Sequence, residues 1–93
     1  MFTMKRRVHI FISGYVQGVS FRAHLWKEAN ANRVTGWVRN LKDKRVEAVL
    51  EGENEGLEKV LAWCHRGPMA ARVENVEVYG ETGTEKLVRF DVR

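Results

Sequence analysis

The sequence predicts an α+β fold in which two helices cover one face of an antiparallel sheet. Three observations predict it: strand-like segments that alternate apolar and polar residues, two segments with apolar residues at helical spacing, and the order in which these segments follow one another. That order is β-α-β-β-α-β with a further strand at the end, which is the ferredoxin-like, split βαβ arrangement. Alternation within the strands indicates a sheet with one buried face. Because this topology hosts many functions, it does not identify one.

The first third of the chain is predicted to form a strand and a helix, with a second strand close behind. Alternation predicts the first strand over residues 7–13. Ser20 is a suitable N-cap for the helix, which we expect to end near Asn32. Its apolar stripe recurs at a spacing of four residues, at Phe21, Leu25 and Ala29. β-Branched and aromatic residues predict the second strand over residues 35–41.

The middle of the chain is predicted to form a β-hairpin. A polar connection, residues 42–45, joins the second strand to a third strand over residues 46–50. The pair Asp43-Lys44 does not suit a tight turn. The connection therefore needs either a longer loop or Lys44 at a positive φ.

The second helix is predicted from one apolar face and from a stop signal at its end. That face carries Leu57, Val60, Leu61 and Cys64. Gly67-Pro68 ends the helix. Two strands follow, over residues 73–79 and 87–92, and residues 80–85 form the turn-rich loop between them. In the last strand three apolar residues are predicted to face one way: Val88, Phe90 and Val92.

Length and composition predict one soluble domain spanning residues 1–93. The chain is 44% hydrophobic and 30% charged, as in ordinary globular proteins, and no apolar run is long enough to span a membrane. Its start places basic residues after apolar ones, which is not the order of a signal peptide. The one cysteine, Cys64, excludes an internal disulfide. We expect a cytoplasmic monomer without a membrane partner.

The positive charge is concentrated in the first half of the chain. Residues 1–45 carry ten Lys or Arg and two acids, a net charge of +8, whereas the remainder carries a net charge of −4. A basic half favours an anionic partner. Charge alone does not separate a small phosphate compound from a nucleic-acid backbone.

The stretch Gly14 to Arg22 has the layout of an anion-binding loop. It joins a strand to a helix, its glycines let backbone N–H groups turn inward, and Arg22 in the first helical turn supplies a bidentate donor. No Lys-Ser or Lys-Thr follows the second glycine and Gly-x-Gly is absent, so a nucleoside triphosphate or NAD is not expected. The alternative is a tight turn in which the glycines serve geometry only.

Two motifs resemble the acylphosphatase family, and the resemblance extends over nearly the whole chain. They are Gly14-x-Val16-Gln17-Gly18-Val19-x-Phe21-Arg22 and Gly36-Trp37-Val38-Arg39-Asn40-Leu41. One departure is Lys44, which stands where the family usually has a glycine. The resemblance implies an enzyme that hydrolyses small acyl phosphates without metal or cofactor, with inorganic phosphate or sulfate as competing anions.

The resemblance also implies a role for each matched residue. Arg22 binds the phosphoryl group, and Asn40 orients the attacking water. The loop whose amides hold the phosphate oxygens comprises Tyr15, Val16, Gln17, Gly18 and Val19. These roles agree with the chemistry, because an acyl phosphate has a good leaving group and needs mainly positioning and charge stabilisation. Arg39 lies on the opposite strand face from Asn40 and receives no role.

Two alternatives belong to other functional classes. A nucleic-acid-binding module of this topology needs aromatic residues on a central strand, and residues 46–50 contain none. A non-catalytic relative that binds an anion is the other, and the presence of both Arg22 and Asn40 argues against it. The histidines His9, His24 and His65 lack metal-ligand spacing. Cys64 lies on the apolar helix face, so we expect a buried, inert thiol.

Overall fold

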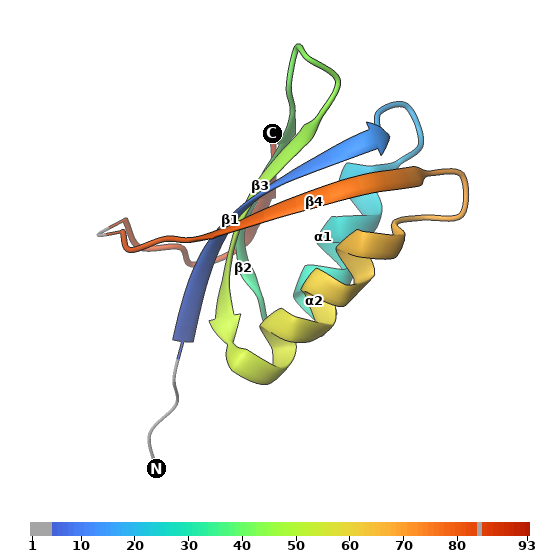
Figure 1. Cartoon of the computed structure of the whole chain (residues 1–93). Coiled ribbons are helices and arrows are strands. Elements are labelled where there is room, and N and C mark those ends of the chain that lie inside the picture. Colours follow the sequence, from blue (N-terminus) through green and yellow to red (C-terminus); the bar gives the residue numbers. More distant parts are fainter. Residues whose placement is uncertain (1–4, 84) are drawn as a thin grey trace.

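The secondary structure follows the order that the sequence predicts (Figure 1). The computed structural model describes residues 5–83 and 85–93. Residues 1–4, which belong to the segment tested for a signal-peptide pattern, lie outside the described residues. So does Thr84 of the predicted loop 80–85. The elements are β1 (Lys5–Tyr15), α1 (Phe21–Ala31), β2 (Thr35–Asn40), β3 (Val46–Glu53), α2 (Asn54–Arg66), β4 (Arg72–Gly80) and β5 (Phe90–Val92).

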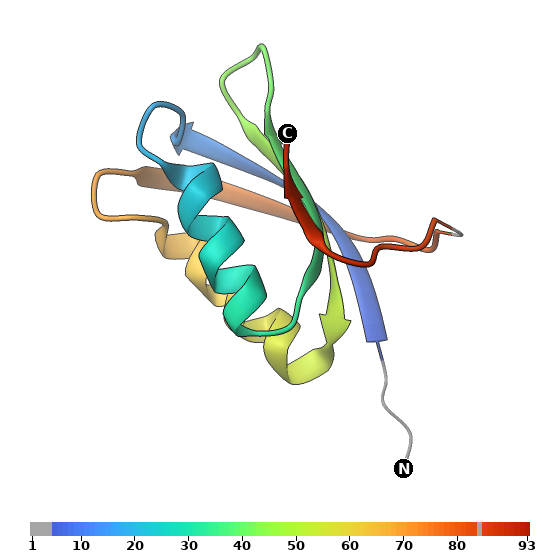
Figure 2. The same ribbon diagram turned by 180° about the vertical axis from the view of Figure 1, so that it is seen from behind.

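The strands form a single open sheet in the order β4-β1-β3-β2-β5. β1 pairs antiparallel with β3 and β4, and β2 pairs antiparallel with β3. Both helices lie on one face of the sheet, which confirms the predicted fold class (Figures 1 and 2). β5 adds a parallel pair with β2, so the sheet is mixed rather than purely antiparallel. In the described part of the chain, no helix is long and apolar enough to cross a membrane.

The hydrophobic core lies between the sheet and the two helices. Alternate residues of β1, among them Ile10 and Ile12, point from the sheet into this core. Phe21 and Leu25 of α1 meet them, and Leu57 of α2 completes the contact; all five side chains are at most 2% exposed. Burial of each such side chain stabilises the fold by about 1.5–3 kcal/mol. The predicted apolar stripes of both helices are therefore the faces that pack.

The last strand is shorter than predicted. Of residues 87–92, only Phe90–Val92 form a strand, because only they lie alongside β2 at Gly36–Val38. The preceding residues belong to the connection that crosses from the β4 edge of the sheet to the β5 edge (Figure 2). Val88 lies outside the strand and is 72% exposed, whereas Phe90 is buried, so the prediction that the strand includes Val88 is wrong.

The β2–β3 hairpin contains the strained turn that the sequence left as one of two alternatives. Lys44 has a φ of 81°, a left-handed conformation that favours glycine. The N–H of Leu41 donates to the carbonyl of Arg45 at 2.9 Å, and the N–H of Lys44 donates to the carbonyl of Leu41 at 3.2 Å. These two bonds close the loop at its base, where β2 and β3 end their pairing.

Candidate active site

A pocket of about 460 Å³ lies where β1 runs into α1, and it brings together both predicted catalytic residues. Arg22 reaches it from the first turn of α1, and Asn40 from the last position of β2. Its lining residues are Val16, Gly18, Ser20, Phe21, Arg22, Ala23, Asn40 and Val92. Val92 reaches it because β5 pairs with β2, where Val92 lies opposite Val38. Figure 2 shows β5, in red, alongside β2.

The two loop glycines serve different purposes. Gly14 has a φ of 123°, and a Cβ there would lie 2.1 Å from the carbonyl oxygen of Arg72. It sits at a shift in the β1–β4 register after Ser13, so its lack of a side chain serves strand packing. Gly18 has a φ of 77°, a Cβ there would meet nothing within 4 Å, and the residue lines the pocket. The alternative that the glycines serve only the geometry of a turn therefore fits Gly14, which is required for strand packing. It does not account for the position of Gly18 in the pocket lining.

The five predicted loop residues are not equivalent in the structure. Val16 and Gly18 line the pocket. Tyr15 is the last residue of β1, pairs with Arg72 and is 61% exposed, whereas Val19 belongs to the hydrophobic core. The side chain of Gln17 turns toward the β2–β3 hairpin and donates there to two backbone carbonyls. The backbone of Val16 to Val19 belongs to the loop that joins β1 to α1, and Tyr15 lies directly before it.

Arg22 faces the pocket without an Asp or Glu partner among the described residues. Its Nη1 donates to the main-chain oxygen of Arg93, the last residue of the sequence, at 2.8 Å, and no other hydrogen bond or ion pair of the described residues engages the guanidinium. The remaining N–H groups can therefore donate to a ligand. An arginine with free N–H donors at the start of a helix, beside a glycine loop, is an arrangement that favours anions.

Ser20 stands directly before α1, as predicted, but it does not cap the helix with its side chain. It has a φ of 62° and makes no side-chain capping hydrogen bond. The prediction of its position is confirmed and that of its capping bond is wrong. Its left-handed backbone bends the chain into α1, which places Ser20 itself among the pocket residues.

Asn40 shares the helix-facing side of β2 with Gly36 and Val38, both buried. This alternation directs it toward α1 and the loop. Arg39 lies on the opposite face, as predicted, where its Nε donates to Oε1 of Glu47 at 2.5 Å. Arg39 is thus held away from the pocket that Asn40 lines.

The remaining titratable candidates are engaged elsewhere. Burial, with a smaller contribution from the charge of Glu28, raises the pKa of the Cys64 thiol to about 12, which agrees with a buried, inert side chain. Ring nitrogens of His24 and His65 lie 2.8 and 2.9 Å from the backbone carbonyls of Ser20 and Leu61. Within residues 5–83 and 85–93, no group of three or more His, Cys, Asp or Glu could hold a metal ion.

The sheet face opposite the helices carries aromatic rings on β1 and β2. The prediction against nucleic-acid binding took only residues 46–50, in β3, into account. His9 and Phe11 of β1 stack at 4.8 Å between centroids, and Trp37 of β2 lies beside His9. Three arginines of this face are paired with carboxylates: Arg7 with Glu51, Arg39 with Glu47, and Arg45 with Asp43 and Glu77. The guanidinium of Arg93 lies over the ring of Trp37, 4.5 Å from its centroid. Paired arginines are poor ligands for a nucleic-acid backbone, which carries its own negative charge.

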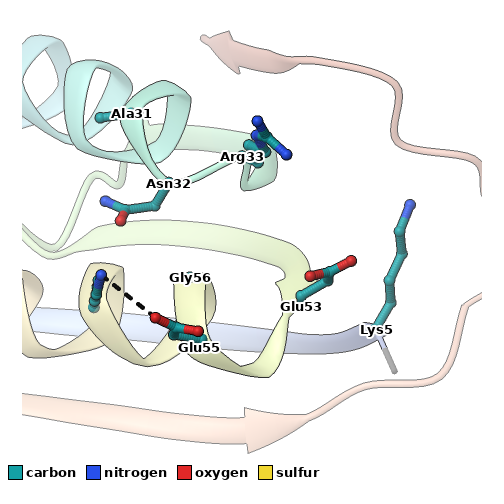
Figure 3. Close-up of a pocket in the computed structure, with 8 residues that line it drawn as sticks. Lys5, Ala31, Asn32, Arg33, Glu53, Glu55 and Gly56 are labelled. Carbon is teal, nitrogen blue, oxygen red and sulfur yellow. Dashed lines mark ion pairs between the residues drawn. The ribbon is translucent and has the colours of Figure 1, made fainter. Parts of the chain in front are cut away.

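A second pocket, of about 500 Å³, lies at the other end of the helices (Figure 3). Lys5, Asn32, Arg33, Glu53, Glu55 and Lys59 are among its lining residues. Its cations are accompanied by acids, and Lys59 pairs with Glu55 at 3.7 Å. No predicted site residue lies there. The pocket of Arg22 and Asn40 is therefore the better anion site.

Four lining residues were not predicted from the sequence. Ser20, Phe21 and Ala23 lie within two residues of Arg22, so their proximity to the motif was an available signal. Val92 lies far from both motifs and reaches the pocket only through the parallel β2–β5 pair. No local pattern in the sequence indicates that contact.

Comparison of the sequence and the fold with known proteins identifies the family of this chain. The family model for acylphosphatase matches residues 8–92. An acylphosphatase from Chloroflexus aurantiacus is 55% identical over 86 residues, which cover 92% of this chain and 94% of the relative. Among solved structures, an acylphosphatase from Coxiella burnetii has a TM-score of 0.90 and 37% identity, with 96% of this chain and 93% of that chain covered. One from Bacillus subtilis has a TM-score of 0.90 and 31% identity, with 97% and 99% covered. The chain therefore belongs to the acylphosphatase family, as its two sequence motifs led us to expect.

Proposed function

We propose that this acylphosphatase hydrolyses the carboxyl–phosphate anhydride bond of small acyl phosphates to a carboxylate and inorganic phosphate, without metal or cofactor. The observation that carries the proposal is that Arg22 and Asn40, from separate elements, line one pocket built on the β1–α1 loop. The family membership supports the reaction class, and the pocket supports the assignment of roles to residues.

Phosphate binding falls to Arg22 and to the backbone of residues 15–19. The planar guanidinium can donate to two phosphoryl oxygens at once, which a lysine point charge does poorly. Backbone N–H groups of the loop donate to the third oxygen, and the positive end of α1 adds to their effect. Gly18, with its left-handed φ, allows the loop to turn beside the ligand.

Water positioning falls to Asn40. Its amide carbonyl accepts a hydrogen bond from water and its NH₂ donates one, but the amide is no base at neutral pH. The water oxygen attacks phosphorus while the bond from phosphorus to the bridging oxygen breaks, and the carboxylate leaves. The proton of the water passes to a phosphoryl oxygen of the substrate. Loss of one such positioned donor lowers the rate by about 10²- to 10³-fold.

The test is hydrolysis of a simple acyl phosphate with a chelator present. We expect turnover by the wild type, competitive inhibition by inorganic phosphate or sulfate, and strong loss of activity in Arg22→Lys and in Asn40→Ala. Arg66→Lys and Asn30→Ala, both exposed on helices away from the pocket, are matched controls and should retain activity.

Two outcomes would contradict the proposal. Wild-type activity in the Asn40→Ala protein would remove the water-positioning role. Absence of turnover by the wild type, together with salt-sensitive RNA binding, would favour the nucleic-acid module instead.

We also propose that the protein acts as a cytoplasmic monomer with a single catalytic domain over residues 1–93. In support, Arg22 and Asn40 of one chain already line the same pocket, and the one cysteine, Cys64, is buried and free, so it is not placed for a disulfide between chains. Light scattering coupled to size-exclusion chromatography tests the oligomeric state. A stable dimer would contradict this part of the proposal and leave the chemistry untouched.

A further inference from the structure

We propose that the side chain of Gln17 is a positioning residue for Asn40 rather than a ligand of the substrate. This inference rests on the proposed function, in which Asn40 orients the attacking water. The backbone N–H of Gln17 then belongs to the phosphate-binding loop, whereas its side chain fixes the position of Asn40.

The geometry of the Gln17 amide is unambiguous. Its Nε2 donates to the carbonyl oxygen of Leu41 at 2.8 Å and to that of Arg45 at 2.9 Å. Two carbonyl acceptors require the NH₂ group at this position, because the amide oxygen could not bond to either. Both N–H donors of the side chain are thereby used, so neither remains for a phosphate oxygen.

The two accepting carbonyls close the base of the β2–β3 hairpin. β2–β3 pairing ends at Asn40, which lies opposite Val46, and the N–H of Leu41 then donates to the carbonyl of Arg45 at 2.9 Å. The Gln17 side chain therefore donates to both residues, Leu41 and Arg45, that form the cross-strand hydrogen bond next to Asn40. Because Leu41 is the next residue, a shift of its carbonyl moves the backbone that carries the Asn40 side chain.

The hairpin needs this external contact because its own turn is strained. Lys44, with a φ of 81°, holds a conformation that a lysine does not favour. The loop from Leu41 to Arg45 therefore has a weak preference for its shape. Gln17 ties this loop to residues 14–22, so that Asn40 keeps a fixed position relative to Arg22 across two elements.

The variant that tests the inference is Gln17→Met, which keeps the length of the side chain and removes both donors. A small displacement of a catalytic group can lower a rate by about 10²-fold. We expect kcat for a simple acyl phosphate to fall by about 10- to 100-fold, whereas the inhibition constant for inorganic phosphate stays within about twofold. A tenfold weaker phosphate affinity with unchanged kcat would overturn the inference and make the side chain a ligand.

A double-mutant comparison separates positioning from general destabilisation. If Gln17 acts through Asn40, then Gln17→Met should cause little further loss of kcat in an Asn40→Ala background. Full multiplication of the two losses would overturn the inference. Lys42→Ala is the control, because Lys42 is an exposed loop residue whose side chain makes no hydrogen bond or ion pair with the described residues, and it should leave kcat unchanged.

A readout independent of activity keeps the inference separate from the proposed function. Hydrogen exchange of the Leu41 amide, which donates to Arg45, should be faster in Gln17→Met than in the wild type. Unchanged exchange would overturn the inference even in an active enzyme. Absence of wild-type turnover would instead contradict the proposed function. Gln17→Glu, which places a carboxylate against the two carbonyls, should behave as Gln17→Met does and serves as the second variant if that one fails to fold.

Discussion

Nε2 of His9 lies 2.6 Å from Oε2 of Glu47, on the sheet face opposite the helices. The other oxygen of Glu47 accepts from Arg39, and Glu47 is only 6% exposed, with Phe11 of β1 directly opposite it. Burial alone would raise the pKa of Glu47. The hydrogen bonds and charges of Arg39 and His9 outweigh that effect, so the pKa lies below its ordinary value of 4.5.

Glu47 should make the stability of the fold depend on acid pH. Because its pKa is lower in the folded than in the unfolded chain, its contribution is fully present above about pH 4.5 and is lost as the pH falls through the folded value. We expect Glu47→Gln to lower the free energy of unfolding by about 1–3 kcal/mol at pH 7 and by less at pH 3. Urea unfolding at both pH values measures the difference, with Glu74→Gln on the exposed side of β4 as the control. An equal difference at both pH values would contradict the role of the charge.

Lys44→Gly should stabilise the protein. At a φ of 81°, glycine avoids the steric conflict of a Cβ, and this gain exceeds its larger entropy in the unfolded chain. We expect an increase of up to about 1 kcal/mol in the free energy of unfolding. Lys42→Gly is the matched control, because Lys42 has no positive φ, and it should be neutral or destabilising. Thermal unfolding of the two variants decides between strain at Lys44 and a general effect of glycine in the loop.

Gly14→Ala and Gly18→Ala should fail in different ways. A Cβ at position 14 meets the carbonyl oxygen of Arg72, so we expect a loss of about 3 kcal/mol or more of stability. A Cβ at position 18 meets nothing, and its left-handed φ should cost about 1–2 kcal/mol. Because Gly18 lines the pocket, we expect its variant to bind inorganic phosphate more weakly while remaining folded. Urea unfolding measures the stability of both variants, and inhibition by phosphate measures their affinity for the anion. An equal loss of stability in both variants would contradict the different roles of Gly14 and Gly18.

Cys64 should resist thiol reagents in the folded protein. Burial and the charge of Glu28 raise the pKa of its thiol to about 12, and the thiolate is the reactive form. We expect no labelling by a thiol-specific reagent near pH 8 in native conditions and complete labelling in denaturant. Rapid labelling of the native protein would show that α2 opens far more often than its packing implies.

The type and order of the secondary elements could be predicted because local patterns decide them, whereas pairing partners could not. Val88 continues the alternation of the last strand but is exposed, since a strand exists only where another lies alongside it. Glu47 shows the same limit. Its position in β3 marks it as facing away from the helices, but only its neighbours His9 and Arg39, from other strands, explain why it is buried.

The two halves of the site were predicted with different detail. Arg22 and Asn40 share a pocket, as the two motifs indicate. The sequence could not distinguish the two uses of Gln17, because a primary amide can donate to phosphate or to carbonyls with equal ease. Only the fold shows that its donors point at the hairpin.

The place of β5 in the fold has a consequence for protein synthesis. A growing chain carries Arg22 and Asn40 well before it carries Phe90–Val92, which cover the free edge of β2 and bring Val92 to the pocket. Until these residues have left the ribosome, the pocket lacks one wall. A product of interrupted translation that stops before β5 would therefore contain both motifs and lack the strand that brings Val92 to the pocket.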